Sequence, residues 1–342
     1  MPQNLRMKPL LVTGLPGVPG WNLFHWFQKN WGGEVVGIRP PANLKADVPG
    51  SVALDAKDGH LLAELFETYK FGAVVDASGN CALKACECDT ALSDLLNCHF
   101  GVEVARQARR LGVPLVRLSS DLVFSGDDSH KGPYFETEIP DPVSAYGKSM
   151  ALAERMIQEV KPDCHILRIP LPMGMTPGGH AGAIDWIEWR FRNNRPATLY
   201  FDERRSPIHK DDLAEVVNWI LLHPEVPTGI YHCGGPRTLS LYEIAQIINV
   251  AGNYPPGLLQ GCQRVEAGPL PPRAGDVSVN SDKLLAHLPA GMIRPWPLDS
   301  RLVPTDRHWH ATFDRTPLGF QRQIDPLLIE GKYIEDLHEN AC

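Results

Sequence analysis

The first half of the chain alternates short apolar runs with amphipathic stretches. Four of the runs have the length and unbroken hydrophobicity of buried parallel strands: Leu10–Thr13, Glu34–Ile38, Ala73–Ala77 and Leu115–Ser119. Three stretches between them carry apolar residues at helical spacing: Asn22–Trp31, His60–Tyr69 and Cys98–Leu111. A helix beginning near Tyr146 and a strand at Cys164–Ile169 continue the alternation. This pattern predicts an α/β fold, a doubly wound parallel sheet with helices on both faces.

The pattern changes beyond about residue 172, where Gly and Pro become frequent and the regular alternation ends. Two more helices are indicated at Asp211–His223 and Ser240–Ala251, and the short segment Gly229–His232 is expected to return to the main sheet. We therefore expect one domain over residues 1–171, and a smaller, irregular lobe that takes up most of residues 172–342.

Composition and charge narrow the function classes. The chain has 342 residues, 43% hydrophobic and 21% charged, as in ordinary globular proteins, which excludes a disordered chain. Its net charge of −7, without a long Lys/Arg run, argues against nucleic acid or an anionic membrane as the main partner. No apolar stretch approaches the ~20 residues of a membrane helix, and the first apolar run leads straight into a glycine motif, unlike a signal peptide. These features predict a cytoplasmic protein.

Four of the eight cysteines lie close together, which raises the question of a metal or iron–sulfur site: Cys81, Cys86, Cys88 and Cys98. Their spacing has no CxxC pair, which the common zinc and cluster motifs use. His308 and His310 alternate as two ligands on one strand would, but no Cys or carboxylate pair is spaced to complete a site with them. We expect reduced thiols and no metal site.

A glycine-rich loop follows the first strand. In TGLPGVPG, Gly14, Gly17 and Gly20 are spaced three residues apart, between the end of a strand and the start of a helix. Glycines there allow a tight turn, close approach of the backbone to a pyrophosphate and close helix–strand packing, and the helix N-terminus offers amide donors. The loop predicts a Rossmann-type dinucleotide site; a glycine-rich turn without a ligand is the alternative. The residues expected to hold the dinucleotide here are Gly14, Leu15, Pro16, Gly17, Val18 and Gly20.

The end of the second strand bears on the choice of cofactor. A carboxylate there would bind the ribose 2′-hydroxyl of NAD, but the sequence is GIRPP, and Arg39 could pair with a 2′-phosphate. Asp55, after the next short strand, is placed to meet the adenine end. We predict NADP(H) in preference to NAD(H). The alternative is that Arg39 is a solvated surface arginine.

Nine segments, in this order along the chain, carry a resemblance to a known family: TGLPGVPG, LDAKD, the expected helix Asn97–Gly112, LSSDLVFSG, SAYGKSMALAE, LRIPLPMG, RRSPIHKDDLAE, GIYHCGG and PPRAGDVSVNSDKL. The chain resembles the extended short-chain dehydrogenases/reductases. Within them it is most similar to the dTDP-4-dehydrorhamnose reductase branch, which also includes the regulatory beta subunit of methionine adenosyltransferase. The resemblance spans roughly residues 8 to 285.

In that family a Ser or Thr, a Tyr and a Lys form the reaction centre. The resemblance places Ser120 at the hydroxyl position and Tyr146 at the proton donor, with Asp121 as a further catalytic candidate. The lysine expected four residues after the Tyr is replaced by Met150. Positions four apart differ by about 40° around a helix, so Tyr146 and Met150 share a face, whereas Lys148 lies about 200° away and points to the other side.

The missing cation changes the chemistry expected of Tyr146. Without a neighbouring positive charge a phenol stays near its reference pKa of about 10. An adjacent charge moves a pKa by ~1–3 units, which is worth about 10- to 1000-fold in rate if proton transfer limits turnover. A neutral Tyr146 can still donate a proton, so Met150 does not exclude a reduction.

The resemblance also implies residues around the cofactor and the substrate. For the cofactor these are Ala77, Ser78, Gly79, Asn97, Tyr146 and Pro170. An alternative for Asn97 is a helix residue bonded to a neighbouring loop. For the substrate they are Arg205 and Arg273, because guanidinium groups suit phosphate oxygens. An alternative for Arg205 is a solvated arginine opposite Asp202 and Glu203.

Three functions remain open from the sequence. The first is an NADP(H)-dependent reductase of a nucleotide-linked 4-keto-sugar or related ketone, with a compromised proton-donating centre. The second is a non-catalytic, cofactor-binding regulatory or partner subunit, which keeps the fold after its chemistry has lapsed. The third is a nucleotide-sugar epimerase or dehydratase. A homodimer or a partner enzyme is compatible with each of them.

Overall fold

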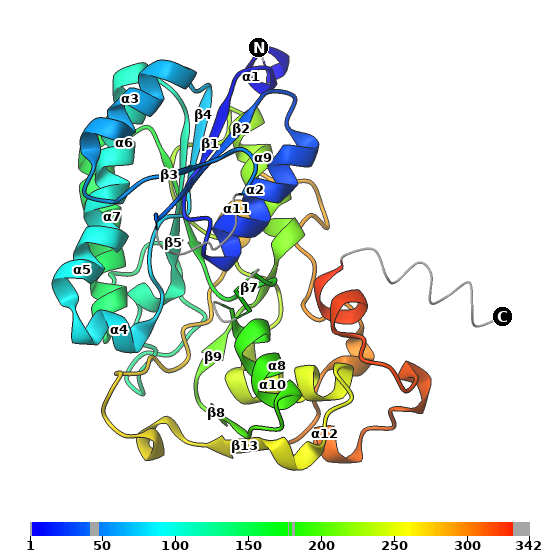
Figure 1. The fold of residues 1–342 in the computed structure, drawn as a ribbon. Coiled ribbons are helices and arrows are strands. Elements are labelled where there is room, and N and C mark those ends of the chain that lie inside the picture. The colour runs from blue at the N-terminus through cyan, green and yellow to red at the C-terminus, as the bar shows by residue number, and fades with distance from the viewer. Residues whose placement is uncertain (1, 42–47, 177, 180–181, 331–342) are drawn as a thin grey trace.

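The computed structural model describes residues 2–41, 48–176, 178–179 and 182–330. At its centre is a seven-stranded parallel sheet in the order β11-β6-β5-β4-β1-β2-β3 (Figure 1). The strands are β1 (Leu10–Val12), β2 (Val35–Arg39), β3 (Ser51–Ala53), β4 (Ala73–Asp76), β5 (Leu115–Ser120), β6 (His165–Ile169) and β11 (Gly229–His232). The chain order reverses between β1 and β4, so the crevice at their carboxyl ends is where doubly wound sheets bind ligands.

Helices cover both faces of this sheet (Figure 1). One face packs on α3 (Gly59–Tyr69), α6 (Phe100–Leu111) and α7 (Ala145–Val160), and the other on α2 (Val18–Asn30) and α9 (Lys210–Leu222). Successive side chains of β1 divide between the two cores: Leu10 and Val12 belong to the α2–α9 side and Leu11 to the α6–α7 side. Because both faces are buried, the strands are hydrophobic throughout, which is the pattern that predicted them.

A second core lies in the lobe drawn below the sheet in Figure 1. It joins α8 (Ala183–Arg192) and α10 (Leu241–Ala251) to the parallel pair β8 (Ala197–Tyr200) and β13 (Leu259–Cys262), with Trp296 fully buried among them. The remaining strands are short: β7 (Pro172–Met173), β9 (Arg204–Arg205), β10 (Ile208–His209) and β12 (Leu239–Ser240).

The other helical elements are short. The α-helical ones are α1 (Pro2–Arg6), α4 (Leu83–Cys88), α5 (Thr90–Asp94), α11 (Asp282–Leu285) and α12 (Trp309–Thr312). Single 3₁₀ turns lie at Asp121–Val123, Pro256–Leu258, Arg264–Ala267, Ser300–Leu302 and Thr316–Leu318, and π-helical turns at Leu95–His99 and Asp325–Ile329.

The predicted α/β class is confirmed, while several boundaries differ. The helix expected from Asn22 begins at Val18, directly after Gly17. The helix expected from Cys98 is preceded by a π-helical turn and α5, so one continuous helical segment begins at Thr90. Gly229–His232 pairs with β6 in the main sheet. The division of the chain at residues 171 and 172 stays a prediction. None of the described helices has the length and apolar character needed to cross a bilayer.

A buried histidine ties β11 to the loops around it. The Nδ1 atom of His232 lies 3.1 Å from the carbonyl oxygen of Tyr134, and its Nε2 lies 3.4 Å from Arg168 Nη1. A carbonyl can only accept and a guanidinium can only donate, so these partners suit the neutral ring protonated at Nδ1. Burial, with the charge of Arg168 adding to it, lowers the pKa of His232 to about 4.

We expect His232 to make the fold sensitive to acid. The unfolded ring takes up its proton near its ordinary pKa of 6.5 and the folded ring only near about 4, so the unfolded state binds more protons between these values. Stability therefore falls as the pH drops through this window, by up to about 3 kcal/mol at its lower end. Urea unfolding across the window should show a shallower acid loss in His232→Gln than in the native chain.

A matched control is His308→Gln, at an exposed histidine, which should keep the native slope. His209, whose pKa burial also lowers to about 4, should supply part of the loss that persists in His232→Gln. Identical slopes in the native chain and in His232→Gln would contradict this account of the acid loss.

Candidate functional site

The glycine loop between β1 and α2 is shaped by backbone contacts. Gly14 has a φ of 74°, and a Cβ there would lie 2.0 Å from the carbonyl oxygen of Ala77, at the end of β4. A Cβ on Gly20 would lie 2.1 Å from the carbonyl oxygen of Gly14. The first glycine thus permits the turn beside β4 and the last brings α2 against the turn. At Gly17, the N-cap of α2, the nearest such atom is 3.4 Å away, so a side chain there would meet only ordinary van der Waals contact.

The side chains of the loop point mostly inward. Leu15 and Val18 are buried, and Leu15 fills the space left by Gly37 on β2, where a Cβ would lie 2.6 Å from Leu15 Cδ2. Pro16 is partly buried. A ligand at this loop would therefore meet mainly backbone, as a pyrophosphate on a helix N-terminus does.

Two predicted residues lie on the β2–β3 side of the cradle. Arg39 ends β2 and is partly buried, and its Nε donates to Ser51 Oγ at 3.3 Å. Asp55 is exposed, and its Oδ1 accepts from the backbone N–H of Lys57 at 2.9 Å. The guanidinium is thus at the edge where a ribose 2′-substituent would lie in a dinucleotide site.

The floor of the crevice is a buried polar network at the end of β4. Asp76 Oδ1 accepts from Thr13 Oγ1 at 2.5 Å and from the backbone N–H of Ser78 at 3.1 Å. Its Oδ2 accepts from Arg117 Nη1 at 2.7 Å. These bonds hold the loop through Ala77, Ser78 and Gly79 beside the glycine cradle.

Asn97 lies in the π-helical turn before α6 and is fully buried. Its Oδ1 accepts from the backbone N–H of Asn80 at 2.6 Å, and its Nδ2 donates to Ser93 Oγ and to Ser149 Oγ. Its backbone oxygen accepts from Arg117 at 2.8 Å. The side chain is therefore occupied in joining the loop after β4 to α7, which is the alternative that the sequence left open.

Ser120 and Tyr146 lie at the carboxyl edge of the sheet, where a Cβ on Gly147, next to Tyr146, would lie 2.1 Å from the carbonyl oxygen of Leu122. Ser120 ends β5, its Oγ accepts from the backbone N–H of Leu122 at 3.1 Å, and it lies 3.2 Å from Asp121 Oδ1. Tyr146 lies in the first turn of α7, after the N-cap Ser144, and is buried. Burial raises the pKa of Tyr146, the nearby Cys81 adds to the rise, and a hydrogen bond with Ser120 opposes it. Tyr146 is thus a protonated phenol over the ordinary pH range.

The position of the missing lysine is part of the same buried cluster. Met150 and Tyr146 pack together, whereas Lys148 is exposed, as the helical geometry predicts. The Met150 sulfur lies 3.9 Å from Arg117 Nη2. Pro170, which directly follows β6, is also buried at this edge of the sheet.

The two predicted substrate arginines belong to a chain of ion pairs. Arg205 is buried; its Nη1 lies 2.9 Å from Asp121 Oδ1 and its Nη2 lies 2.7 Å from Glu203 Oε1. Arg273 Nη1 lies 3.3 Å from Glu203 Oε2. Arg205 is therefore not a solvated arginine, and both it and Asp121 are already paired. The ion pairs connect Asp121, next to Ser120, to the lobe.

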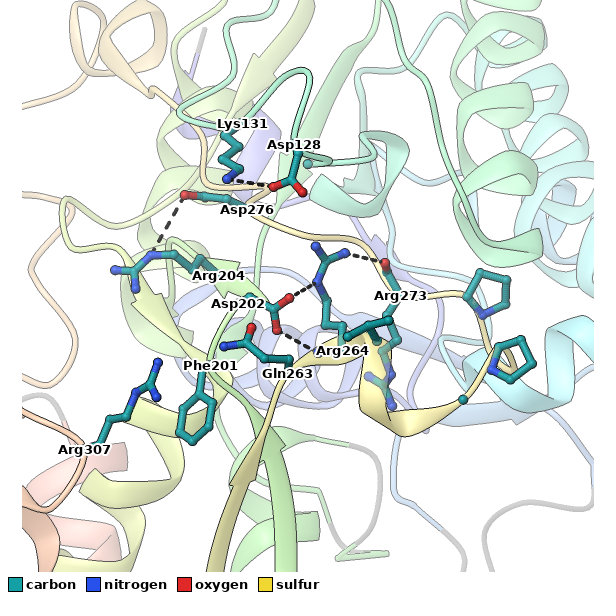
Figure 2. Close-up of a pocket in the computed structure, with 15 residues that line it drawn as sticks. Asp128, Lys131, Phe201, Asp202, Arg204, Gln263, Arg264, Arg273, Asp276 and Arg307 are labelled. Carbon is teal, nitrogen blue, oxygen red and sulfur yellow. Dashed lines mark hydrogen bonds and ion pairs between the residues drawn. The ribbon is translucent and has the colours of Figure 1, made fainter.

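Arg273 stands at the edge of a pocket of about 810 Å³ between the lobe and the loop after β5 (Figure 2). Five cationic side chains line it: Lys131, Arg204, Arg264, Arg273 and Arg307. Three carboxylates do so: Asp128, Asp202 and Asp276. The Arg307 guanidinium lies 4.0 Å from the centre of the Phe201 ring, and Arg273 lies 4.7 Å from that of Tyr200. Most of these residues lie outside the motifs recognised in the sequence, so the sequence did not predict that they line a pocket.

The four clustered cysteines differ in their exposure. The seven cysteines that the structure describes are unpaired; among the four in question, Cys86 and Cys98 are buried and Cys81 and Cys88 are exposed. Within the described ranges, no group of three or more His, Cys, Asp or Glu side chains is arranged to hold a metal ion.

Curated relatives and a family model match most of the chain. The model described as RmlD substrate binding domain matches residues 7–298. Methionine adenosyltransferase 2 subunit beta of Rattus norvegicus is 26% identical over 261 residues, 74% of each chain. The dTDP-4-dehydrorhamnose reductase of Aggregatibacter actinomycetemcomitans is 26% identical over 244 residues, 70% of this chain and 77% of that one.

Solved structures share the fold. A hypothetical dTDP-4-dehydrorhamnose reductase from Sulfolobus tokodaii has a TM-score of 0.70 at 23% identity, covering 84% of this chain and 96% of its own. The Bacillus anthracis dTDP-4-dehydrorhamnose reductase, in complex with NADP, has a TM-score of 0.68 at 19% identity, covering 82% and 92%. The Bordetella bronchiseptica enzyme WbmG, in complex with NAD, has a TM-score of 0.68 at 19% identity, covering 82% and 87%. The chain belongs to the RmlD substrate binding domain family, as the resemblance of its motifs to dTDP-4-dehydrorhamnose reductases predicted.

Proposed function

We propose that this protein is an NADP(H)-dependent reductase of a nucleotide-linked 4-keto-sugar or a closely related ketone. The observation that carries the proposal is that the first turn of α7, which holds Tyr146, packs on the turn that follows Ser120, where a Cβ on Gly147 would lie 2.1 Å from the carbonyl oxygen of Leu122. A hydroxyl pair next to a dinucleotide cradle suits a hydride transfer accompanied by proton donation.

The residues present fit a pyridine dinucleotide. The backbone of Gly14–Gly20 would hold the pyrophosphate, Arg39 the 2′-phosphate, and Ala77–Gly79 the adenosine side, with Pro170 beside the nicotinamide. When bound, NADPH supplies the hydride. The complexes of two similar folds, one with NADP and one with NAD, support a nucleotide cofactor of this class.

Tyr146 is the proposed proton donor. Its phenol proton passes to the carbonyl oxygen of the substrate, which becomes a hydroxyl as the carbon is reduced. Burial raises the pKa of Tyr146, so the phenol holds its proton until the substrate takes it, and Ser120 is the neighbouring hydroxyl of the proposed centre. Asp121, held by Arg205, fixes the turn that follows Ser120 rather than exchanging a proton itself.

The cationic and aromatic side chains of the lobe pocket suit a substrate that carries a negative charge and an aromatic ring. Arg273 offers a guanidinium at its edge, and Phe201 offers a ring that Arg307 already covers on one side. A diphosphate joined to a base has matching charge and a matching flat surface. A nucleotide-linked sugar would thus lie with its diphosphate near Arg273 and its keto group toward Tyr146.

Arg39 gives a test of the cofactor preference. In Arg39→Ala the dissociation constant for NADPH should rise about 10- to 100-fold, because a charged hydrogen bond to the 2′-phosphate is lost. The constant for NADH, which lacks that phosphate, should stay within about twofold and serves as the internal control. Calorimetry measures both, and an equal change for the two cofactors would contradict a role of Arg39 at the 2′-phosphate.

A non-catalytic, cofactor-binding subunit is the second candidate, and Met150 is the observation that favours it. The similarity to a protein named as a beta subunit of methionine adenosyltransferase supports the same interpretation. The full chain should be incubated with NADPH and a nucleotide-linked 4-keto-sugar, and the loss of NADPH followed. Turnover supports the reductase. NADPH binding without turnover, with co-purification of an enzyme whose kinetics the chain changes, supports the subunit.

A nucleotide-sugar epimerase or dehydratase is the third candidate. An epimerase or dehydratase would use the same cradle and pocket, and conversion of a sugar nucleotide without net loss of NADPH would identify it.

Unpaired cysteines suit a reducing compartment, so we propose a cytoplasmic location. A homodimer or a complex with a partner enzyme is tested by the mass of the purified protein in solution.

A further inference from the structure

The space beside Met150 holds a positive charge from another element. Arg117 projects from β5 toward α7 and is 1% exposed, and its Nη2 lies 3.9 Å from the Met150 sulfur. Met150 is one helical turn after Tyr146. The buried cation of this region therefore comes from the sheet and not from the helix that carries Tyr146.

Four hydrogen-bond partners hold Arg117 rigidly. Its Nη1 donates to Asp76 Oδ2 and to Ser78 Oγ, both at 2.7 Å, and its Nη2 donates to the backbone oxygen of Asn97 at 2.8 Å and to the Met150 sulfur. Asp76, with no exposed surface, is the carboxylate that pairs with it. The guanidinium is thereby fixed between the floor of the crevice, the π-helical turn and α7.

A glycine in α6 leaves room for the pair. A Cβ on Gly101 would lie 3.0 Å from Asp76 Oδ2 and 3.1 Å from Arg117 Nη1. Glycine inside a helix costs roughly 1 kcal/mol relative to alanine. Its presence here is explained by the space that the ion pair occupies.

Arg117 and a lysine at position 150 exclude each other. The ammonium group of such a lysine would enter a dry site in which one carboxylate, Asp76, already neutralises one guanidinium. A second buried cation without a partner is costly. A thioether, in contrast, is apolar and weakly accepts from the guanidinium. Met150 is therefore the side chain that this position tolerates once Arg117 is present.

We propose that Arg117 supplies, from β5, the positive charge that relatives draw from the lysine after the Tyr, and acts as the positioning residue of this reaction centre. The proposal rests on the proposed function, since it concerns the same Tyr146 and the same cofactor crevice. Arg117 acts through Ser78, Asn97 and Met150, which border that crevice. Its charge also favours ionisation of the phenol, against the burial that raises the pKa of Tyr146.

The experiment exchanges the two side chains. Arg117→Met/Met150→Lys returns the cation to the helix and keeps one positive charge opposite Asp76. Asp76→Asn/Arg117→Met removes the ion pair without leaving a buried charge. Lys148→Met, which removes an exposed cation from the same helix, is the control. The thermal midpoint, kcat, KM and the NADPH dissociation constant are measured for each protein.

We expect Asp76→Asn/Arg117→Met to lower kcat about 10-fold or more at a nearly constant substrate KM, because the positive charge of Arg117 favours loss of the phenol proton of Tyr146. The exchange should restore kcat to within about threefold of the native value, and Met150→Lys alone should lower the thermal midpoint. Lys148→Met should leave all four quantities unchanged. The proposal would be overturned if Asp76→Asn/Arg117→Met kept the native kcat. It would also be overturned if Arg117→Met/Met150→Lys restored the thermal midpoint but not kcat.

Failure of the reductase is a separate result. If the native chain reduces no ketone, the proposed function is wrong, and the NADPH dissociation constant then decides the role of Arg117. An NADPH dissociation constant that is raised about 10-fold in Asp76→Asn/Arg117→Met and returns to the native value in Arg117→Met/Met150→Lys supports the positioning role at the crevice. A constant that is the same in all variants overturns it.

Discussion

Tyr146→Phe should lower kcat for ketone reduction by about 100- to 10,000-fold, while the NADPH dissociation constant stays near the native value. Positioned general acids contribute factors of this size, and phenylalanine keeps the ring but lacks the proton. The buried setting strengthens the expectation, since Tyr146 packs against Met150 and Val123 in one buried cluster. Single-turnover reduction, followed by loss of NADPH, measures the effect.

Tyr69→Phe is the matched control for this substitution. Tyr69 ends α3, where its ring stacks on Phe71 at 5.4 Å, away from the crevice. Its loss of a hydroxyl should leave kcat within about twofold of native. Undiminished reduction by Tyr146→Phe would mean that another group donates the proton, and the assignment of Ser120 would fall with that of Tyr146.

Gly14→Ala should be the most damaging single change to the cofactor cradle. Its Cβ would lie 2.0 Å from the carbonyl oxygen of Ala77, in backbone that cannot move without shifting the end of β4, and the φ of 74° adds strain. We expect a loss of about 3 kcal/mol or more in the free energy of unfolding, together with loss of NADPH binding.

Gly112→Ala separates the steric clash from backbone strain. Gly112 has a similar φ of 63°, but no atom lies within 4 Å of its Cβ position. It should cost about 1–2 kcal/mol and leave NADPH binding intact. Urea unfolding and calorimetry compare the two variants. Equal losses of stability would show that the contact with Ala77 is relieved at little cost.

Much of the sheet and the cradle could be predicted because their signals are local. A strand buried on both faces is continuously apolar, as in Leu10–Val12, and a strand-to-helix turn needs glycine at fixed spacing, as at Gly14 and Gly20. Tyr146 and Met150 could be placed on one face because they share a helix. Each of these inferences uses a few neighbouring residues and a known period.

The contacts that define the reaction centre could not be predicted in this way. Arg117 on β5 contacts Asp76 on β4 and Met150 on α7, and Asp121 pairs with Arg205, which is distant from it in the sequence. No period relates such positions, so their pairing depends on how the elements pack. The sequence showed that a lysine was missing, but it did not show which charge lies beside the resulting methionine.

The return of β11 to the sheet has a consequence for any attempt to divide the protein. A fragment that stops after β6 would lack β11, which pairs with β6 from His165 to Arg168, and α9, which buries one face of the sheet. The edge strand β6 would then present unpaired amide and carbonyl groups, and Val116 and Leu167 would be partly exposed without α9. Such a fragment would self-associate, so grafting a foreign lobe onto this scaffold requires keeping residues 210–232 of the native chain.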